Sequence, residues 1–276
     1  MKKLLSLLTI FIFIGDIQAQ TSEQTIYRAE FMFCNFNEGK TYQDVLAEQE
    51  TYEQFLTENG LEYNRLNLQP IWDNDSEYDY VMWGNWPNGE MQYKEWGAYM
   101  NDYPAWASEN DIPAQSAGDC ENFVSMRNHR VYRIRADSYD DRMFTDWRQC
   151  KLKPRADMTE LKAAYAEMEQ LARDTGRSGS AIHFFTPYRG FQDELPYDFL
   201  MSQIWYTSEA RSASVENWSE WRALLEESGF FKKRDKHIES CSGADTYQLD
   251  WVFSTCLLYT SPSPRDRTRS RMPSSA

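Results

Sequence analysis

The sequence predicts an α+β protein that contains two copies of one βαββαβ unit, and two observations lead to that prediction. The segment YDYVMWGNW, residues 78–86, recurs in altered form as YDFLMSQIW, residues 197–205. Outside these segments, residues match at an offset that rises in small steps from 116 to 121, as insertions in loops would cause. The matched positions include Cys34 with Cys150, Gly60 with Gly176, Pro70 with Pro187, and Cys120 with Cys241. An ordered set of matches of this kind indicates a tandem duplication.

The first copy opens with a strand and a helix. Residues 26–36, IYRAEFMFCNF, are long and apolar enough for a strand that is buried on at least one face. Thr41 is a suitable N-cap for the helix that follows, and Gly60 is suited to end it. Between them runs an apolar stripe with helical spacing, made of Val45, Leu46, Tyr52 and Phe55.

Two strands, a shorter helix and a last strand complete the copy. Residues 64–72 and 78–86 are the second and third strands, and Pro70 marks an edge or a bulge in the earlier one. Residues 91–100 are expected to form the second helix, and residues 122–135 the last strand.

The second copy repeats this order, with its clearest helices at residues 159–176 and 214–229. In this ferredoxin-like order the fourth strand lies antiparallel beside the first. The end of strand one then meets the beginning of strand four, which is where the cysteines fall. Topology and duplication therefore favour two disulfides, Cys34–Cys120 and Cys150–Cys241. Four reduced thiols or a metal site are the alternative, but no Cys-x-x-Cys motif or histidine cluster accompanies these cysteines.

Both ends of the chain differ in composition from the rest. Residues 1–19 read as a signal peptide with cleavage after Ala19, and an N-terminal anchor is the alternative. Residues 256–276 are basic and rich in Ser and Pro, and they can be back-translated without a break into a widely used transposase sequencing adapter. We therefore expect a disordered tail of read-through DNA at 256–276, which includes Cys256. The first repeat then occupies residues 20–141 and the second residues 142–255.

The chain carries a formal net charge of −14, and both ends add positive charge, so the part between them is more acidic still. A surface this negative repels nucleic acid and anionic membranes. The apolar core of the leader is too short for a membrane span, which needs about 20 residues. We expect a periplasmic or secreted protein with no nucleic-acid partner and no membrane span after cleavage of the leader.

Two βαββαβ units in one exported chain resemble the dimeric α+β barrel superfamily in its fused, pseudo-dimeric form. This superfamily includes cofactor-independent monooxygenases related to antibiotic biosynthesis, and haem-degrading enzymes. The resemblance covers nearly all of residues 26–255 and is one of topology. It implies a monomeric pseudo-dimer with a cavity between sheet and helices or inside the barrel. It also implies a ligand-contacting tryptophan on the third strand, and Trp86 and Trp205 hold that position.

Strand alternation predicts which side chains share a face with these two tryptophans. An aromatic face that also carries methionines suits a small apolar or aromatic ligand, and plain core packing is the alternative. The expected neighbours are Tyr78, Tyr80 and Met82 in the first copy, and Tyr197, Phe199 and Met201 in the second. Asp79 and Asp198 point the other way, where each could act as a general base, cap a turn or pair with an arginine.

Histidine is scarce in this chain. His183 lies on a predicted strand, where it could act as an acid, a base or a haem ligand, or simply be a satisfied core residue. His129 and His237 sit among charged residues and are expected at the surface. The second helices hold no histidine, so we expect no haem, no other cofactor and no metal.

Three hypotheses for the function follow, and the sequence leaves open whether the protein is an enzyme. The favoured one is a protein that binds a small apolar or aromatic molecule in the cavity of the barrel. The second is a cofactor-independent, monooxygenase-like enzyme that uses polar groups such as Asn35, Asn67 or His183. The third is a non-catalytic interaction module with an acidic surface.

Overall fold

The computed structural model describes residues 26–72, 76–112, 116–191 and 195–255. The predicted signal peptide and the predicted read-through tail lie outside the described residues. The first copy consists of β1 (Ile26–Phe36), α1 (Tyr42–Glu58), β2 (Asn64–Trp72), β3 (Tyr80–Trp86), α2 (Gly89–Asn101), α3 (Tyr103–Glu109) and β4 (Gly118–Ile134). The second copy consists of β5 (Arg142–Leu152), α4 (Met158–Asp174), β6 (Ser180–Arg189), β7 (Phe199–Trp205), α5 (Ser208–Glu216), α6 (Trp218–Glu227), α7 (Phe230–Asp235), β8 (Ile238–Cys241) and β9 (Asp245–Ser254).

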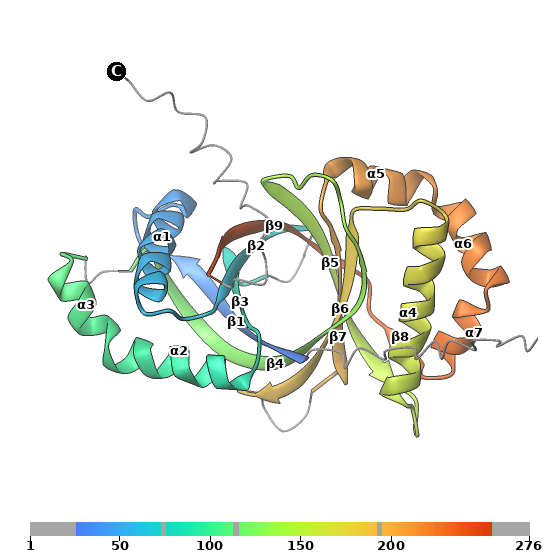
Figure 1. Ribbon diagram of the computed structural model, residues 1–276, viewed down its shortest axis with the longest axis horizontal. Helices are drawn as coiled ribbons and strands as arrows, with labels where there is room; N and C mark the ends of the chain where they lie inside the picture. Colours follow the sequence, from blue (N-terminus) through green and yellow to red (C-terminus); the bar gives the residue numbers. More distant parts are fainter. Residues whose placement is uncertain (1–25, 73–75, 113–115, 192–194, 256–276) are drawn as a thin grey trace, which may run out of the picture.

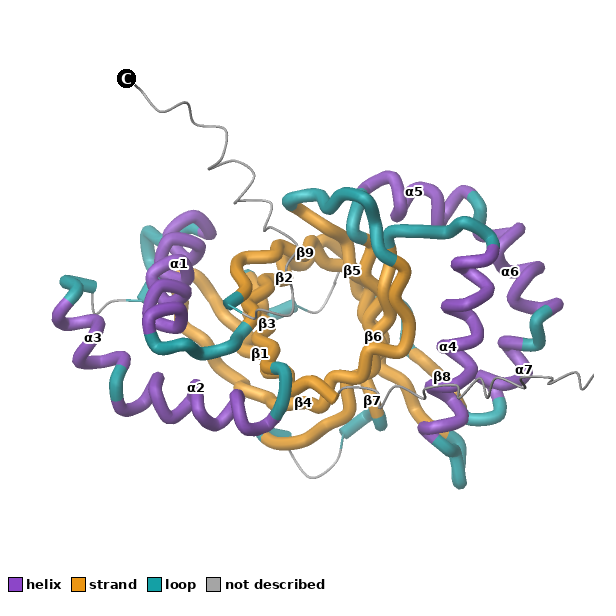
Figure 2. The backbone as a smooth tube through the Cα atoms, in the orientation of Figure 1, coloured by secondary structure: helices purple, strands orange, loops and turns teal. Residues whose placement is uncertain are grey.

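The strands close into one barrel. Within the first copy the strand order is β4-β1-β3-β2, and the second copy repeats it with β9-β5-β7-β6. The copies join twice, because β2 pairs with β9 and β4 pairs with β6, and all these pairings are antiparallel. Figure 2 shows the resulting ring of strands, with one group of helices on each side. The predicted α+β class and the tandem βαββαβ units are confirmed, and the molecule is a pseudo-dimeric α+β barrel.

Aromatic side chains fill the middle of the barrel. Phe31 on β1 and Trp83 on β3 lie with ring centroids 5.8 Å apart, and Trp147 on β5 and Phe185 on β6 lie 5.0 Å apart. Phe31 also contacts Trp147 edge-on at 5.4 Å, so the two copies meet through these four rings. The inward faces of the two halves therefore form one shared core.

The outward faces of the strands are covered by helices (Figure 1). Helix α4 is an example. It begins after Asp157, whose side chain accepts hydrogen bonds from two backbone N–H groups of the first turn. Its buried residues recur every three or four positions, as an amphipathic helix requires. They are Leu161, Ala164, Tyr165, Met168 and Ala172. Helix α1 begins, as predicted, after Thr41, which forms a capping box with Asp44.

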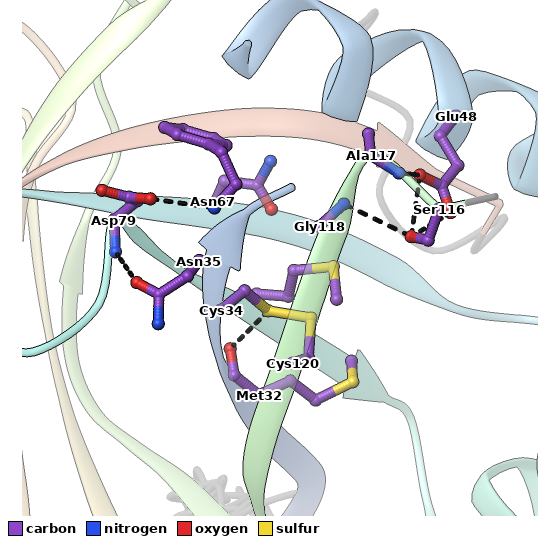
Figure 3. The surroundings of a disulfide bond; sticks show 12 residues. Met32, Cys34, Asn35, Glu48, Asn67, Asp79, Ser116, Ala117, Gly118 and Cys120 are labelled. Atoms are coloured by element: carbon purple, nitrogen blue, oxygen red, sulfur yellow. Dashed lines mark hydrogen bonds between the residues drawn. A yellow bond between two sulfur atoms is a disulfide. The ribbon is translucent and has the colours of Figure 1, made fainter. Parts of the chain in front are cut away.

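Two disulfides tie the first strand of each copy to its last. Cys34 on β1 is bonded to Cys120 on β4, and Cys150 on β5 to Cys241 on β8 (Figure 3 shows the first pair). The predicted pairing is confirmed. Sequence separations of 86 and 91 residues make each bond worth roughly 4–5 kcal/mol in the chain-entropy account.

The matched aspartates occupy the same place in both copies. The Asp79 carboxylate accepts a hydrogen bond from the backbone N–H of Phe36 at 2.8 Å, and the Asp198 carboxylate accepts one from Leu152 at 2.7 Å. Each aspartate thus fixes the end of the first strand of its copy.

Three details were not predicted from the sequence, and the last two of them distinguish the copies. The third strands begin at Tyr80 and Phe199. The expected alternation therefore does not reach Tyr78, which packs against the barrel core and shares a hydrogen bond of 2.9 Å with Tyr247. The last strand of the second copy is broken into β8 and β9, and three short helices replace α2 and α3.

Candidate functional site

A cavity of about 160 Å³ lies in the first copy, between the outward face of the sheet and the helices. Strands β1 to β4 form its floor, and helices α1, α2 and α3 form its roof. The floor contributes Glu30, Met32, Arg65, Tyr80, Met82, Cys120 and Phe123. The roof and the rim contribute Val45, Glu48, Gln49, Tyr52, Glu95, Trp96, Tyr99, Tyr103 and Ser116.

Three neighbouring strands place two opposite charges on the floor. Glu30 on β1 and Arg65 on β2 are both in register with Gly84 on β3, which lies between them. Gly84 has no side chain, and a Cβ atom there would lie only 2.2 Å from the hydroxyl oxygen of Tyr63. The glycine thereby lets Tyr63 reach across the strand and donate a hydrogen bond of 3.0 Å to Glu30.

Glu30 is a carboxyl group in an environment that favours its neutral form. Burial raises its pKa, and the charge of Arg65 and the hydrogen bond from Tyr63 offset part of that rise, which leaves the pKa at about 7. A carboxyl group with this pKa exchanges its proton near neutral pH.

Arg65 is a buried cation with incomplete hydrogen bonding. Only 6% of its surface is exposed. One Nη lies 2.8 Å from the Met82 sulfur, a weak acceptor, and the guanidinium stacks on the Tyr63 ring at 5.0 Å. Its Nε finds no hydrogen-bond partner among the described residues. A buried donor of this kind is costly unless a ligand or a water molecule completes it.

A second carboxyl group approaches from the roof. Glu95 on α2 accepts a hydrogen bond from the Tyr52 hydroxyl on α1, and burial raises the pKa of Glu95. Beside it, Gln49 and Asn67 exchange two amide hydrogen bonds of 3.2 and 2.9 Å, so both of these buried side chains have partners. The polar groups of the cavity therefore come from two strands and two helices.

Hydrogen bonds fix the rim of the cavity close to the Cys34–Cys120 disulfide. The Glu48 carboxylate on α1 accepts hydrogen bonds from the Ser116 hydroxyl at 2.9 Å and from the Ala117 N–H at 2.7 Å. Figure 3 shows Glu48 above this segment, which leads through Gly118 to the disulfide at Cys120. These bonds attach the loop before β4 to the roof helix.

The corresponding space in the second copy is filled in part, and the rest of it opens into a groove. Asp146, Gln203 and Ile182 occupy the positions in register that Glu30, Gly84 and Arg65 occupy in the first copy. Aromatic rings pack where the first copy has Gln49, Asn67 and Tyr80. These rings are Tyr165, Phe184 and Phe199, with Tyr165 and Phe199 4.9 and 4.8 Å from Phe184. The first copy therefore has a polar cavity where the second has an apolar core beside an open groove.

The predicted site residues separate into different places. Tyr80 and Met82 line the cavity, and Trp86, which is fully buried, lies in the neighbouring cluster under α2 and α3. Their partners Phe199 and Met201 belong to the packed core of the second copy. Tyr80, Met82 and Trp86 face the helices, because side chains alternate along a strand and Val81 and Trp83 point into the barrel.

Trp205 lines a wide groove of about 970 Å³ between α5, α6 and the end of β7. Arg211 stacks on its ring at 4.0 Å and forms an ion pair of 3.3 Å with Asp146. A second stacked pair, Arg177 on Trp221 at 4.3 Å, lines the same groove. The groove is larger than the cavity of the first copy, but exposed polar side chains form much of its wall.

His183 lies inside the barrel, apart from both spaces. Its ring stacks on Phe185 at 6.0 Å, and its Nδ1 lies 2.7 Å from the Asn128 side-chain oxygen. Burial and the nearby charges of Arg130 and Arg133 lower its pKa to about 3, so the ring is neutral and Nδ1 donates to Asn128. Asn128 in turn donates to Asn85 at 3.0 Å.

The expectation that His129 and His237 lie at the surface was wrong. Both are buried, with 6% and 3% of their surface exposed. His129 Nδ1 lies 3.0 Å from the Lys162 amine, and His237 Nδ1 accepts the backbone N–H of Asp157 at 3.0 Å. Helix α4 packs over both rings. This packing could not be predicted from the charged residues that surround the two histidines in the sequence.

Sequence reasoning did not identify Glu30 and Arg65. Both alternate with apolar residues on strands, which reads as a solvent-exposed face. A signal existed in the comparison of the two copies: Arg65 corresponds to Ile182, and Gln49 to Tyr165. Polar residues at positions that are apolar in the other copy mark the face where the polar cavity lies.

No protein-family model matches this chain, and no curated protein matches it by sequence. Its fold is similar to that of an anthrone oxidase-like protein, with 13% identity, a TM-score of 0.46, and coverage of 84% of this chain and 94% of the other. A monooxygenase-like protein of Lactobacillus acidophilus NCFM gives 13% identity and a TM-score of 0.48, with coverage of 83% and 97%. A chlorite dismutase variant from Candidatus Nitrospira defluvii gives 11% identity and 0.46, with coverage of 84% and 93%.

Only the overall architecture is alike at these identities and scores. Within the described ranges, no helix is both long and apolar enough to cross a membrane, and no three His, Cys, Asp or Glu side chains converge as a metal site would require. The strand order and the two internal repeats place the chain in the α+β barrel fold, in its single-chain, pseudo-dimeric form.

Proposed function

We propose that this chain is an exported protein that binds a small aromatic molecule with a polar substituent in the cavity of the first copy. The observation that carries the proposal is the pair of charged residues on the floor of a cavity rich in aromatic side chains. Among the described residues the Arg65 Nε has no hydrogen-bond partner, and Glu30 has a pKa of about 7. The aromatic side chains suit the face of a ring, and the floor suits its polar group. The predicted leader and the two disulfides support export, since disulfides persist in oxidising compartments.

The size of the cavity narrows the ligand to a single ring. A cavity of about 150 Å³ in another protein holds benzene, and the cavity here measures about 160 Å³. The native ligand would be identified by mass spectrometry of molecules retained after purification from the source compartment. Thermal melts with phenol, aniline, benzoate and benzylamine would then rank the polar substituents.

A pair of matched variants tests the cavity itself. Val45 lines the cavity, and Leu161 occupies the corresponding position in the packed core of the second copy. We expect Val45→Phe to keep near wild-type stability and to lose the ligand response, because the added ring enters the cavity. Leu161→Phe should lose about 1–3 kcal/mol through overpacking and keep the response. Equal destabilisation of the two variants, with the response intact in both, would contradict the proposal.

A second candidate function is a monooxygenase-like enzyme, and Glu30 is the observation that favours it. A buried carboxyl group with a pKa near 7 is suited to accept a proton from a phenolic substrate. The three polar residues expected from the sequence do not form one site. Asn67 lies beside the cavity and His183 lies in the barrel. The side chain of Asn35 accepts a hydrogen bond from the backbone N–H of Asp79. Glu30→Gln should bind the ligand but abolish turnover if the protein is an enzyme. Unchanged turnover in that variant would reject Glu30 as the base.

A further inference from the structure

Four basic side chains gather on the outer surface of the barrel where the two copies join. Arg28 lies on β1, Arg127 on β4 and Arg189 on β6. Lys162 on α4 contacts His129, which is two residues beyond Arg127 on β4. We call these residues the seam cluster, because β4 belongs to the first copy and β6 to the second. In Figure 1, β4 and β6 run between helix α2 of the first copy and helix α4 of the second.

The three arginines surround one tyrosine. The guanidinium carbons of Arg28, Arg127 and Arg189 lie 4.4, 4.6 and 5.1 Å from the centre of the Tyr188 ring. Arg28 and Arg127 are also directly opposite each other in the register of β1 and β4. Like charges at directly opposed positions of a sheet destabilise it.

His129 connects Lys162 to this group. Its Nδ1 lies 3.0 Å from the Lys162 amine, and its Nε2 lies 3.4 Å from the Thr186 hydroxyl on β6. Burial, followed by the charges of Lys162, Arg127 and Arg28, lowers the pKa of His129 to about 4. The histidine is therefore neutral, and it does not offset or add to the positive charge.

The charges of the seam cluster have no acidic partner among the described residues. Six basic side chains elsewhere lie within ion-pair distance of a carboxylate: Arg173, Arg211, Arg222, Lys233, Arg234 and Lys236. No such pair involves Arg28, Arg127, Arg189 or Lys162 in the part of the chain that the structure describes. One Nη of Arg28 is buried without a hydrogen-bond partner there. In the described ranges, these four cations therefore share one surface without a carboxylate at ion-pair distance, although the net charge of the chain is −14.

We propose that the seam cluster binds a tetrahedral oxyanion, a phosphate or a sulfate group, outside the cavity of the first copy. An arginine stacked on a ring keeps its in-plane N–H groups free to donate, and arginine recognises phosphate through two parallel hydrogen bonds. The hydroxyl groups of Tyr188 and Tyr93, which lie 3.4 Å apart, supply further polar contacts at the edge of the cluster. A bound dianion removes the mutual repulsion of the four cations.

Calorimetric titration of the full chain with inorganic phosphate, at constant ionic strength set by sodium chloride, tests the proposal. We expect saturable binding of phosphate or sulfate and a rise in melting temperature that chloride does not reproduce. Titration with methyl phosphate distinguishes the two sources of the group. If methyl phosphate binds as tightly as inorganic phosphate, the native ligand is a phosphate ester on a larger molecule. If methyl phosphate does not bind, the native ligand is the free ion.

Two variants with the same change of charge separate a built site from general screening. Arg127→Gln should weaken anion binding about tenfold, in line with the loss of a charge-assisted hydrogen bond. Arg222→Gln is the control, because Arg222 is exposed on α6 and pairs with Glu226. Without anion and at low salt, Arg127→Gln should melt no lower than the wild type, since repulsion is relieved. Equal phosphate responses in the wild type and both variants, or no saturable binding, would overturn the proposal.

Discussion

Single residues decide the chemistry of the first copy, and Glu30 is the clearest case. Gly84 on the next strand and Arg65 on the strand beyond it lie in register with Glu30. Its counterpart Asp146 has Gln203 and Ile182 at these two positions. Asp146 instead accepts a hydrogen bond of 2.8 Å from Thr246 and pairs with Arg211. Two acidic residues of common origin therefore differ in role because of what lies beside them.

The raised pKa of Glu30 predicts a dependence of stability on pH. The carboxyl group titrates near 4.5 in the unfolded chain and near 7 in the folded one. Its contribution is therefore fully present below pH 4.5 and is lost as the pH rises through 7. Glu30→Gln should remove this loss, which amounts to about 3 kcal/mol. Urea unfolding of both proteins from pH 4 to pH 8 measures it, and parallel curves would contradict the pKa.

His183 predicts the opposite trend at acidic pH. Its pKa falls from 6.5 in the unfolded chain to about 3 in the barrel. The stability that depends on the neutral ring is present above pH 6.5 and is lost as the pH falls through 3. His183→Asn should flatten the acid limb of the stability curve while preserving a hydrogen bond to Asn128. Thermal melts between pH 3 and pH 7 provide the measurement, and an unchanged acid limb would exclude His183 as the group responsible.

At the scale of elements, the two third strands are related by sequence but differ in their surroundings. Trp86 is fully buried and contacts Tyr63 at 5.0 Å, under the roof of α2 and α3. Trp205 lies beside an open groove, where α5 and α6 replace that roof and Arg211 covers one face of the ring.

This difference predicts unequal effects of truncation. Trp86→Ala should cost about 3–5 kcal/mol, because it leaves a large void in a closed cluster. Trp205→Ala should cost less, since water can enter from the groove. Guanidinium unfolding of the two variants compares them directly. A loss at Trp205 as large as the loss at Trp86 would show that the groove is closed in solution.

The elements and the disulfides could be predicted from the sequence because both rest on local patterns and on the internal repeat. The Thr41 cap, the strand patterns and the four cysteines each specify their own segment, and duplication supplied the pairing. The cavity could not be predicted in the same way. It depends on Gly84 lying between Glu30 and Arg65 in register, and register between strands is a long-range property. The burial of His129 likewise depends on the packing of α4 over β4.

At the scale of the whole molecule, the barrel is complete only when both copies are present. Within the first copy, β2 and β4 are the outer strands, and each pairs with a strand of the second copy. Separation of the two copies would expose the edges of β2 and β4, together with the inward-facing rings of Phe31 and Trp83. Exposed strand edges and apolar surface favour association.

The duplication also predicts how the first copy, produced alone, should associate with a second molecule of itself. Strand β9 is the fourth strand of the second copy and β6 is its second, so both junctions join a second strand to a fourth. Two molecules of residues 26–141 can therefore form the same two junctions around a twofold axis. We expect this fragment to be a dimer, as measured by sedimentation equilibrium, with strand content similar to that of the whole chain. The closest control is the same fragment with Leu68→Arg, which places a charge on the inward face of β2 and should prevent the dimer. A folded, soluble monomer from the unaltered fragment would show that one copy is stable without the barrel.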